Sequence, residues 1–505
     1  MRLSRNEVAS SVGWSVAENG GLALVSFASL VIYSRFLSPA DFGVFSIALA
    51  TIELFGVLVG MLFHDALVQR AAVTQRHFDT AFTFSLVLSL VLLAVAVAFS
   101  PVLGHLVHHR QAAGTLAATA LSLPFTALTS TIVAQQRREL SFRALAVRSL
   151  TGRLCGAAVG IGLVVAGAGV WGLVAQQVLM AAVGSAVLWF SAKNRPQLGF
   201  GLPEFRELFA FGLYSVSALF LLFAAKRIFT IWAGVLLGAD AAGYLNLAFR
   251  AVDVLWALAA TAVSQVALPA LSRFQADPEA LRRMYRSALG WTCLALYPVF
   301  IGLALVAPEA VALLFGKKWL ASSPYVAAIA CLIVLQAPRL LATPTLTALG
   351  KPRAALVAIG AELVVAATLL STLGAPSLTV AVGIWMAREV VAMPVAAFVL
   401  RRVAGIPLRD QAAAPLVPLL CASVMAAGVY GLGRALPQDL GAAARLLISV
   451  AAGGVLFALC VRIVDRSKLQ SLVDILAPLW PRAAVRSTPG PALAPGPASL
   501  AEERR

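Results

Sequence analysis

The sequence predicts an all-α, polytopic membrane protein with about 14 transmembrane helices, arranged as two six-helix lobes plus two extra helices. Three observations support this. Of 505 residues, 60% are hydrophobic and only 12% are charged, whereas soluble domains carry about 25% charged residues. Apolar runs of about 20 residues, long enough to cross a hydrocarbon core of about 30 Å, recur from end to end. A stretch near the N-terminus also returns later in the chain.

Charges, turn residues and prolines separate the predicted spans. The first run follows MRLSRNEVAS and has no A-x-A cleavage site, so we expect it to remain as the first helix. The fourteen spans are 11–34, 42–63, 80–99, 113–133, 150–167, 170–191, 208–233, 242–268, 287–306, 324–349, 354–373, 379–400, 412–433 and 442–462.

The repeated stretch is LSPADFGVFSIALATIE at 37–53, which returns as LGADAAGYLNLAFRAVD at 237–253. Gly43 then falls on Gly243, and Glu53 falls on Asp253. Many of the other matches involve common residues, but a carboxylate inside an apolar run is costly and its recurrence is therefore informative. The repeat predicts a duplication whose copies are related by an axis along the membrane normal, since six spans restore the orientation.

The duplication divides the chain into four predicted parts. Residues 1–200 form an N-terminal lobe with helices 1 to 6, and residues 201–400 form a C-terminal lobe with helices 7 to 12. Residues 401–465 hold helices 13 and 14. In residues 466–505 we expect an interfacial helix and then a disordered, proline-rich cytoplasmic tail.

The distribution of Lys and Arg predicts the orientation, because positive loops stay on the cytoplasmic side. One side of the predicted topology carries 27 of them, outside the spans or at their ends, and the other side carries 6. Both termini are therefore expected in the cytoplasm. The net charge of +17 then suits anionic membrane lipids, and we do not expect nucleic acid as a partner.

Motifs for catalysis, ATP hydrolysis and metal binding are missing from the sequence. It has no GxSxG, Walker A or HExxH pattern. The five cysteines stand singly in apolar runs, as buried small residues do. His105, His108 and His109 could place two imidazoles one turn apart, but a solvated loop is the expected role. We predict no catalytic residue, metal or cofactor.

The most informative residues are charged groups inside the predicted spans. A charge at the bilayer centre costs about 2.5–3.5 kcal/mol, so each should face protein or water. Lys226, Arg227 and Arg339 lack an acid nearby in sequence, which favours contact with an anionic ligand. Arg153 is close enough to a helix end to reach the interface. The candidate substrate-binding cavity residues are Lys226, Arg227, Arg250, Arg339 and Arg388.

The acidic residues in the spans are candidates for ion coupling or charge balance. They are Glu53, Asp253, Glu362 and Glu389. Arg250 and Asp253 lie three residues apart on one helix, so a local ion pair is the simplest alternative for them. Arg388 and Glu389 are sequence neighbours, and we expect each to need a separate partner.

The LSPADFG turn, the QQRRELSFRALA connection and LGADAAGYLNLA after a basic-tipped seventh helix resemble a known family. They are similar to bacterial polysaccharide (O-antigen type) lipid-linked oligosaccharide flippases, a branch of the multidrug/oligosaccharidyl-lipid/polysaccharide exporter superfamily. The family commonly has an acid before the arginine of helix 7, whereas here Lys226 precedes Arg227.

The resemblance implies two lobes around a cationic cavity and translocation of undecaprenyl-pyrophosphate-linked oligosaccharide by alternating access. Membrane lipids, a polysaccharide polymerase and export machinery are the candidate partners. Alternatives are a multidrug or organic-cation antiporter and a peptidoglycan lipid-precursor flippase of the same superfamily. A membrane polysaccharide polymerase or ligase is the alternative from another class.

Overall fold

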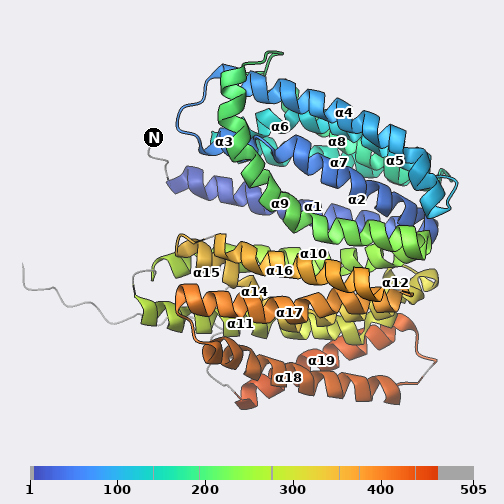
Figure 1. Ribbon diagram of the computed structural model, residues 1–505. Coiled ribbons are helices and arrows are strands. Elements are labelled where there is room, and N and C mark those ends of the chain that lie inside the picture. The colour runs from blue at the N-terminus through green and yellow to red at the C-terminus, as the bar shows by residue number, and fades with distance from the viewer. Residues whose placement is uncertain are drawn as a thin grey trace, which may run out of the picture. The chain divides into compact units, whose positions relative to one another are not determined.

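The computed structural model describes residues 5–464 except 140, 193, 275, 276, 352, 375 and 438. All regular structure in this part of the chain is helical, which confirms the all-α prediction (Figure 1). The interfacial helix and tail predicted in 466–505 lie outside the described residues. Contacts group the chain up to Phe457 into one unit, and a second unit begins at Ala458.

The helices follow the predicted ranges closely. Those of residues 1–200 are α1 (Arg5–Phe36), α2 (Pro39–Met61), α3 (His64–Gln69), α4 (Gln75–Val107), α5 (Ala112–Ala120), α6 (Ser122–Arg138), α7 (Phe142–Val165) and α8 (Val170–Ser191). Next come α9 (Leu202–Leu237), α10 (Ala239–Ser272), α11 (Pro278–Leu305), α12 (Ala307–Leu314), η1 (Lys317–Ser322), α13 (Ser323–Cys331), α14 (Ile333–Leu340), α15 (Ala342–Ala348), α16 (Arg353–Leu373) and α17 (Leu378–Ala404). The last two are α18 (Leu408–Ala435) and α19 (Ala442–Val464).

Within the described residues, ten helices are long and apolar enough to cross a membrane. An eleventh is α9 if its two parts, which bend by 49°, count as one span. The chain is therefore a multi-span membrane protein. Fewer of its described helices are long and apolar enough to cross a membrane than the fourteen spans predicted. The ranges 11–34, 242–268 and 354–373 fall on α1, α10 and α16, which are helical but outside that set.

Two predicted spans are broken in the structure. The range 113–133 is split at Leu121 between α5 and α6, and the range 324–349 is split into α13, α14 and α15. Pro338 in α14 has no N–H to donate to the carbonyl of Val334. The buried Tyr297 hydroxyl donates to that carbonyl instead, at 3.2 Å, so the kinked backbone remains hydrogen-bonded inside the protein.

The two copies of the repeat form helices that start at equivalent positions and pack against each other. α2 begins at Pro39 and α10 begins at Ala239. A Cβ atom on Gly43 would overlap the Ala239 carbonyl, and a Cβ atom on Gly243 would overlap the Pro39 carbonyl. This reciprocal contact is what a two-fold relation between the copies produces. The absence of side chains here lets the two backbones approach closely.

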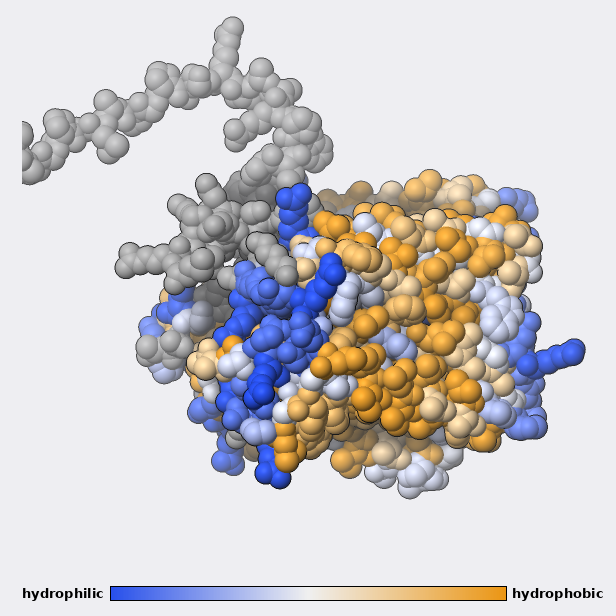
Figure 2. Space-filling view, turned by 90° about the horizontal axis from the view of Figure 1, so that it is seen from above, coloured by the Kyte–Doolittle hydropathy of each residue, from blue (hydrophilic) through white to orange (hydrophobic). Residues whose placement is uncertain are grey.

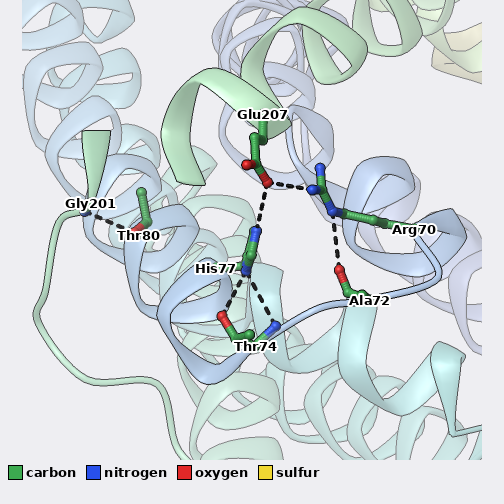
Figure 3. Close-up of polar contacts among 7 residues, drawn as sticks. All are labelled: Arg70, Ala72, Thr74, His77, Thr80, Gly201 and Glu207. Carbon is green, nitrogen blue, oxygen red and sulfur yellow. Dashed lines mark hydrogen bonds and ion pairs between the residues drawn. The ribbon is translucent and has the colours of Figure 1, made fainter. Parts of the chain in front are cut away.

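The predicted cytoplasmic end of residues 1–200 is tied to α9 by polar contacts (Figure 3). The Glu207 carboxylate forms an ion pair with Arg70 and accepts a hydrogen bond from His77 Nε2, 3.2 Å away. The Thr74 N–H donates to His77 Nδ1, so the imidazole proton is on Nε2 and points at Glu207. The Gly201 N–H donates to the Thr80 hydroxyl, 3.1 Å away. The start of α9 is therefore anchored to α4 and the preceding loop.

The predicted outer end has its own link between the two halves. Trp319 is fully buried and donates its indole N–H to the Ser34 carbonyl, at 2.8 Å. Lys318 Nζ donates to the Arg35 carbonyl at 3.0 Å, and the Arg35 guanidinium donates to the Leu313 carbonyl. These bonds join the end of α1 to the segment from α12 to η1.

Figure 2 shows apolar residues over the middle of the visible face, with hydrophilic residues at its ends.

Candidate functional site

The charged residues selected from the sequence line two adjoining cavities. The first, about 440 Å³, is the balanced cavity, with three basic residues (Lys226, Arg339, Arg388) and three acidic ones (Asp253, Glu362, Glu389). The second, about 340 Å³, is the basic cavity, with four basic residues (Arg153, Lys226, Arg227, Arg250) and two acidic ones (Glu53, Asp253). Lys226, Phe249 and Asp253 line both cavities, so these residues stand between them.

Two consecutive residues of α9 hold the equivalent acids of the two repeat copies. Lys226 pairs with Asp253 on α10, and Arg227 pairs with Glu53 on α2. Successive helical side chains project about 100° apart, which lets neighbours reach different helices. The Lys226 ammonium also lies 4.3 Å from the centre of the Phe249 ring. The pair formed by Arg227 and Glu53 therefore bridges residues 1–200 and residues 201–400.

Four charged residues form a closed network beside the balanced cavity. Arg339 of α14 pairs with both Glu362 of α16 and Glu389 of α17. Arg388 pairs with the same two acids, at 3.1 and 2.9 Å. Glu389 is only 2% exposed. The guanidinium of Arg388 also lies 3.6 Å from the Trp385 ring centre, so this network joins three helices through charge and ring contacts.

These pairs bear on three expectations. Lys226, Arg227 and Arg339 have no acid nearby in sequence, and each of them pairs with an acidic residue from another helix. Arg388 and Glu389 were expected to need separate partners, yet these neighbouring residues also pair with each other, at 2.9 Å. The Arg250–Asp253 pair is not formed: Asp253 faces Lys226, and Arg250 Nε donates to Asn246, 3.0 Å away.

The excess of positive charge in the basic cavity comes from Arg153 and Arg250. In the described part of the chain, neither residue has a carboxylate partner, and the buried Nε of Arg153 has no hydrogen-bond partner. Arg153 was expected to reach the interface, but it lines the cavity. Like the other charged candidates, Arg153 lies inside an apolar run of the sequence. Its position near a helix end favoured a location at the membrane interface, and it was therefore left out of the predicted cavity residues.

The free-energy cost of placing charges in lipid requires the charged side chains at the two cavities to be paired or to face a cavity. Ten ionised side chains line the two cavities. At about 2.5–3.5 kcal/mol each, isolated charges in lipid would cost about 25–35 kcal/mol. That exceeds the whole stability of a typical domain, about 5–15 kcal/mol. Salt bridges hold eight of them, and the remaining two, Arg153 and Arg250, line the basic cavity.

Comparisons with known proteins agree with this architecture. The family model described as polysaccharide biosynthesis protein matches residues 32–324. Succinoglycan biosynthesis transport protein ExoT of Rhizobium meliloti (strain 1021) is 26% identical over 487 residues, which cover 94% of this chain and 97% of that protein. Lipopolysaccharide biosynthesis protein WzxC of Escherichia coli (strain K12) is 23% identical over 321 residues, covering 62% of this chain and 64% of that one.

Among solved structures, the lipid II flippase MurJ in its inward closed conformation shares the fold. Its TM-score is 0.72 at 14% sequence identity, covering 91% of this chain and all of that one. The chain thus shares the fold of that membrane protein. The family resemblance drawn from the LSPADFG, QQRRELSFRALA and LGADAAGYLNLA motifs is confirmed by the match over more than half of the sequence. The chain belongs to the polysaccharide biosynthesis protein family.

Proposed function

We propose that this protein moves a lipid-linked oligosaccharide, carried on undecaprenyl pyrophosphate, across the cytoplasmic membrane for polysaccharide biosynthesis. The observation that carries the proposal is the pair of charged cavities inside the membrane-spanning helices, in which basic residues exceed acidic ones by two. A transport role also fits the relatives, of which one is named a transport protein.

The chemistry of the substrate explains the need for such cavities. A pyrophosphate and its sugars cannot enter hydrocarbon without losing several kcal/mol for each unsatisfied polar group. The protein must therefore supply water and cations for the head while the lipid tail stays in the bilayer. In the basic cavity, Arg153 and Arg250 are available to a pyrophosphate without breaking an ion pair between described residues. Arginine suits this role because its planar fork donates to two oxygens at once.

The ion pairs provide a route for coupling. A pyrophosphate that enters the basic cavity competes with Glu53 for Arg227 and with Asp253 for Lys226. A carboxylate that loses its cation in a poorly hydrated site is stabilised by taking up a proton or Na⁺. Glu53 and Asp253 are thus the coupling candidates. Glu362 and Glu389 share two arginines with each other, and we assign them to charge balance.

Alternating access follows if the two lobes, 1–200 and 201–400, rock about the cavities. The two halves are linked at the predicted outer end by the Trp319–Ser34 and Lys318–Arg35 hydrogen bonds. Exposure of the cavities on the outer side requires these bonds to break. We place both termini, with the predicted tail 466–505, in the cytoplasm, because 27 basic residues lie on that side against 6 on the other.

An organic-cation antiporter of the same fold is disfavoured by the charge of the site. A cationic substrate would face two unpaired arginines in the basic cavity and would be repelled by both.

A peptidoglycan lipid precursor is also a lipid-linked pyrophosphate, so the cavity chemistry is compatible with it. A direct comparison of the two lipid substrates would distinguish these two flippases. A polymerase and export machinery are the partners that the product would require.

The test replaces Arg250, which has no carboxylate partner among the described residues, with an uncharged residue. Arg250→Gln should lower surface polysaccharide at least tenfold and cause lipid-linked oligosaccharide to accumulate in cells, with normal protein levels in the membrane. Arg250→Lys should retain part of the function. Arg283→Gln is the matched control, because the Arg283 side chain is 71% exposed and outside both cavities. Normal polysaccharide in Arg250→Gln and Arg153→Gln cells would overturn the proposal.

A further inference from the structure

We propose that Trp319 seals the basic cavity from the predicted outer side of the membrane, at the point where α2 and α10 cross. This inference rests on the proposed function and deepens it, since it assigns a residue that must move before the head of the substrate can leave on that side. Trp319 lies in η1, a short segment between α12 and α13, yet its side chain is fully buried.

The indole of Trp319 contacts three helices at once. Its N–H donates to the Ser34 carbonyl of α1, at 2.8 Å. Its ring meets the Phe42 ring of α2 edge-on, with 5.4 Å between the ring centres, and the Tyr244 ring of α10 edge-on, with 6.2 Å. Ring pairs with this spacing and a perpendicular arrangement attract each other. Because α1 and α2 belong to the first half of the chain and α10 belongs to the second, one side chain holds the two halves together.

The two partner rings flank the close backbone contact between the halves. Phe42 directly precedes Gly43, and Tyr244 directly follows Gly243. The glycines have no side chains, which lets the backbones of α2 and α10 touch. The rings of Phe42, Tyr244 and Trp319 pack beside this contact. The backbone contact and the three rings together form what we call the outer barrier.

A narrow recess leads from the basic cavity to the outer barrier. It measures about 40 Å³ and shares Gln177 and Arg250 with the basic cavity. Phe42 lines the recess, whereas Trp319 lines neither space. On α2, Phe42 lies eleven residues before the cavity residue Glu53, which is about 16–17 Å along the helix towards its predicted outer end. Phe42 therefore contacts the recess and the indole, and Trp319 is the next layer of the barrier.

The geometry shows which contacts must be lost when the outer end opens. Trp319 is carried by a segment that starts after Gly316, whose φ of +101° favours glycine. Movement of the first half away from the second requires the indole to leave Ser34 and Phe42. Tyr244 is in the same half as Trp319 and can move with it. Opening therefore costs one buried hydrogen bond and one ring contact, both made by Trp319.

The reactivity of a thiol in the basic cavity tests this role. Ser26 lines both the basic cavity and the recess, so Ser26→Cys is the reporter, in a protein whose five native cysteines are replaced by alanine. Spheroplasts are treated from outside with sulfonatoethyl methanethiosulfonate, a membrane-impermeant anion that a basic cavity attracts. Trp319→Ala should raise the labelling rate at least tenfold. Trp319→Phe keeps a ring but loses the N–H donor, and should raise the rate less.

A second substitution tests whether the two rings act together. Phe42→Ala should also raise the labelling rate. The double variant Phe42→Ala/Trp319→Ala should be labelled less than twofold faster than the faster single variant, because both residues belong to one barrier and their effects are not additive. Trp171→Ala is the matched control, since Trp171 at the start of α8 is 42% exposed and lines neither space. Its labelling rate should equal that of the reporter protein.

A second reporter separates opening of the barrier from general unfolding. Ala127 of α6 is fully buried and lies outside the basic cavity and the recess. Ala127→Cys should therefore stay unlabelled in the Trp319→Ala protein. If Trp319→Ala is absent from the membrane, the comparison is made with Trp319→Phe.

Equal labelling of Ser26→Cys with and without the Trp319 substitutions would overturn the role of Trp319. The same conclusion would follow if Trp171→Ala raised the rate as much, or if Ala127→Cys were labelled as fast as Ser26→Cys. Labelling requires no substrate, so these results would leave the proposed function standing. The proposed function is tested separately, by the surface polysaccharide of the Arg250→Gln cells.

Discussion

Gly43 and Gly243 occupy equivalent positions in the two repeat copies, and each lies against the first residue of the other copy's helix. The contact joins α2 to α10 backbone to backbone at the predicted outer end. A rocking motion of the two lobes must separate or slide this contact. It is therefore a place where a single added methyl group should affect both stability and transport.

Gly43→Ala should destabilise the protein by about 1–3 kcal/mol, the usual cost of overpacking, because the new Cβ would overlap the Ala239 carbonyl. Surface polysaccharide should fall as well. Gly56→Ala in the same helix is the control, since a Cβ there meets nothing within 4 Å. Thermal unfolding in detergent measures the first effect. Equal melting temperatures for the two variants would refute the close contact.

Glu389→Gln should lower stability more than any exposed acid does. The substitution leaves Arg339 and Arg388 with one shared carboxylate, Glu362. Removal of one partner from a buried pair costs about 3–5 kcal/mol. Glu279→Gln, whose exposed side chain pairs with Arg283 at 3.6 Å, should cost about 0–1 kcal/mol. Thermal unfolding in detergent compares them, and similar shifts in both variants would contradict the network.

Exchange of the charges at the bridging pair should restore function that either single change removes. Glu53→Arg and Arg227→Glu each place like charges together where a salt bridge now stands. The double variant again has opposite charges at the two positions, with the acid and the base exchanged. Cells with the double variant should therefore carry more surface polysaccharide than cells with either single variant. The same three variants give the coupling energy by a double-mutant cycle. A double variant no better than the weaker single one would show that the two residues act separately.

Reporter fusions test the predicted orientation. Alkaline phosphatase placed after Arg505 should be inactive, and a fluorescent protein there should fold, because the basic loops are expected in the cytoplasm. Phosphatase inserted in the loop between α18 and α19 should be active. Phosphatase activity at the C-terminus would reverse the topology and with it the assignment of Trp319 to the outer side.

The sequence predicted the helical architecture and the charged residues at the cavities because both depend on local composition. Apolar runs of sufficient length determine helices in lipid, and a charge within such a run must face protein or water. All nine charged candidates line the balanced cavity, the basic cavity or both. Prolines were less informative about where helices end. Pro394 lies inside α17, and Pro415 and Pro418 lie inside α18, and both helices continue past them. A helix can continue past a proline because neighbouring groups can satisfy the freed carbonyl.

The partners of those charges could not be predicted, because they depend on tertiary packing. Arg227 meets Glu53 across 174 residues of sequence, and no local spacing encodes such a contact. The i,i+3 spacing suggested the pair of Arg250 and Asp253, but Lys226 of the preceding helix occupies that carboxylate. Arg153 was set aside for a related reason, since nearness to a helix end says nothing about which neighbour lies across from it.

The two halves contribute unequally to the charge pairs at the cavities. The acids Glu53 and Asp253 occupy equivalent positions, but their bases, Lys226 and Arg227, both come from α9. At the same offset of 200, the first half has Ser26 and Phe27, which carry no charge. Because α9 supplies both cations, a protein assembled from two copies of residues 1–200 would lack both of these salt bridges.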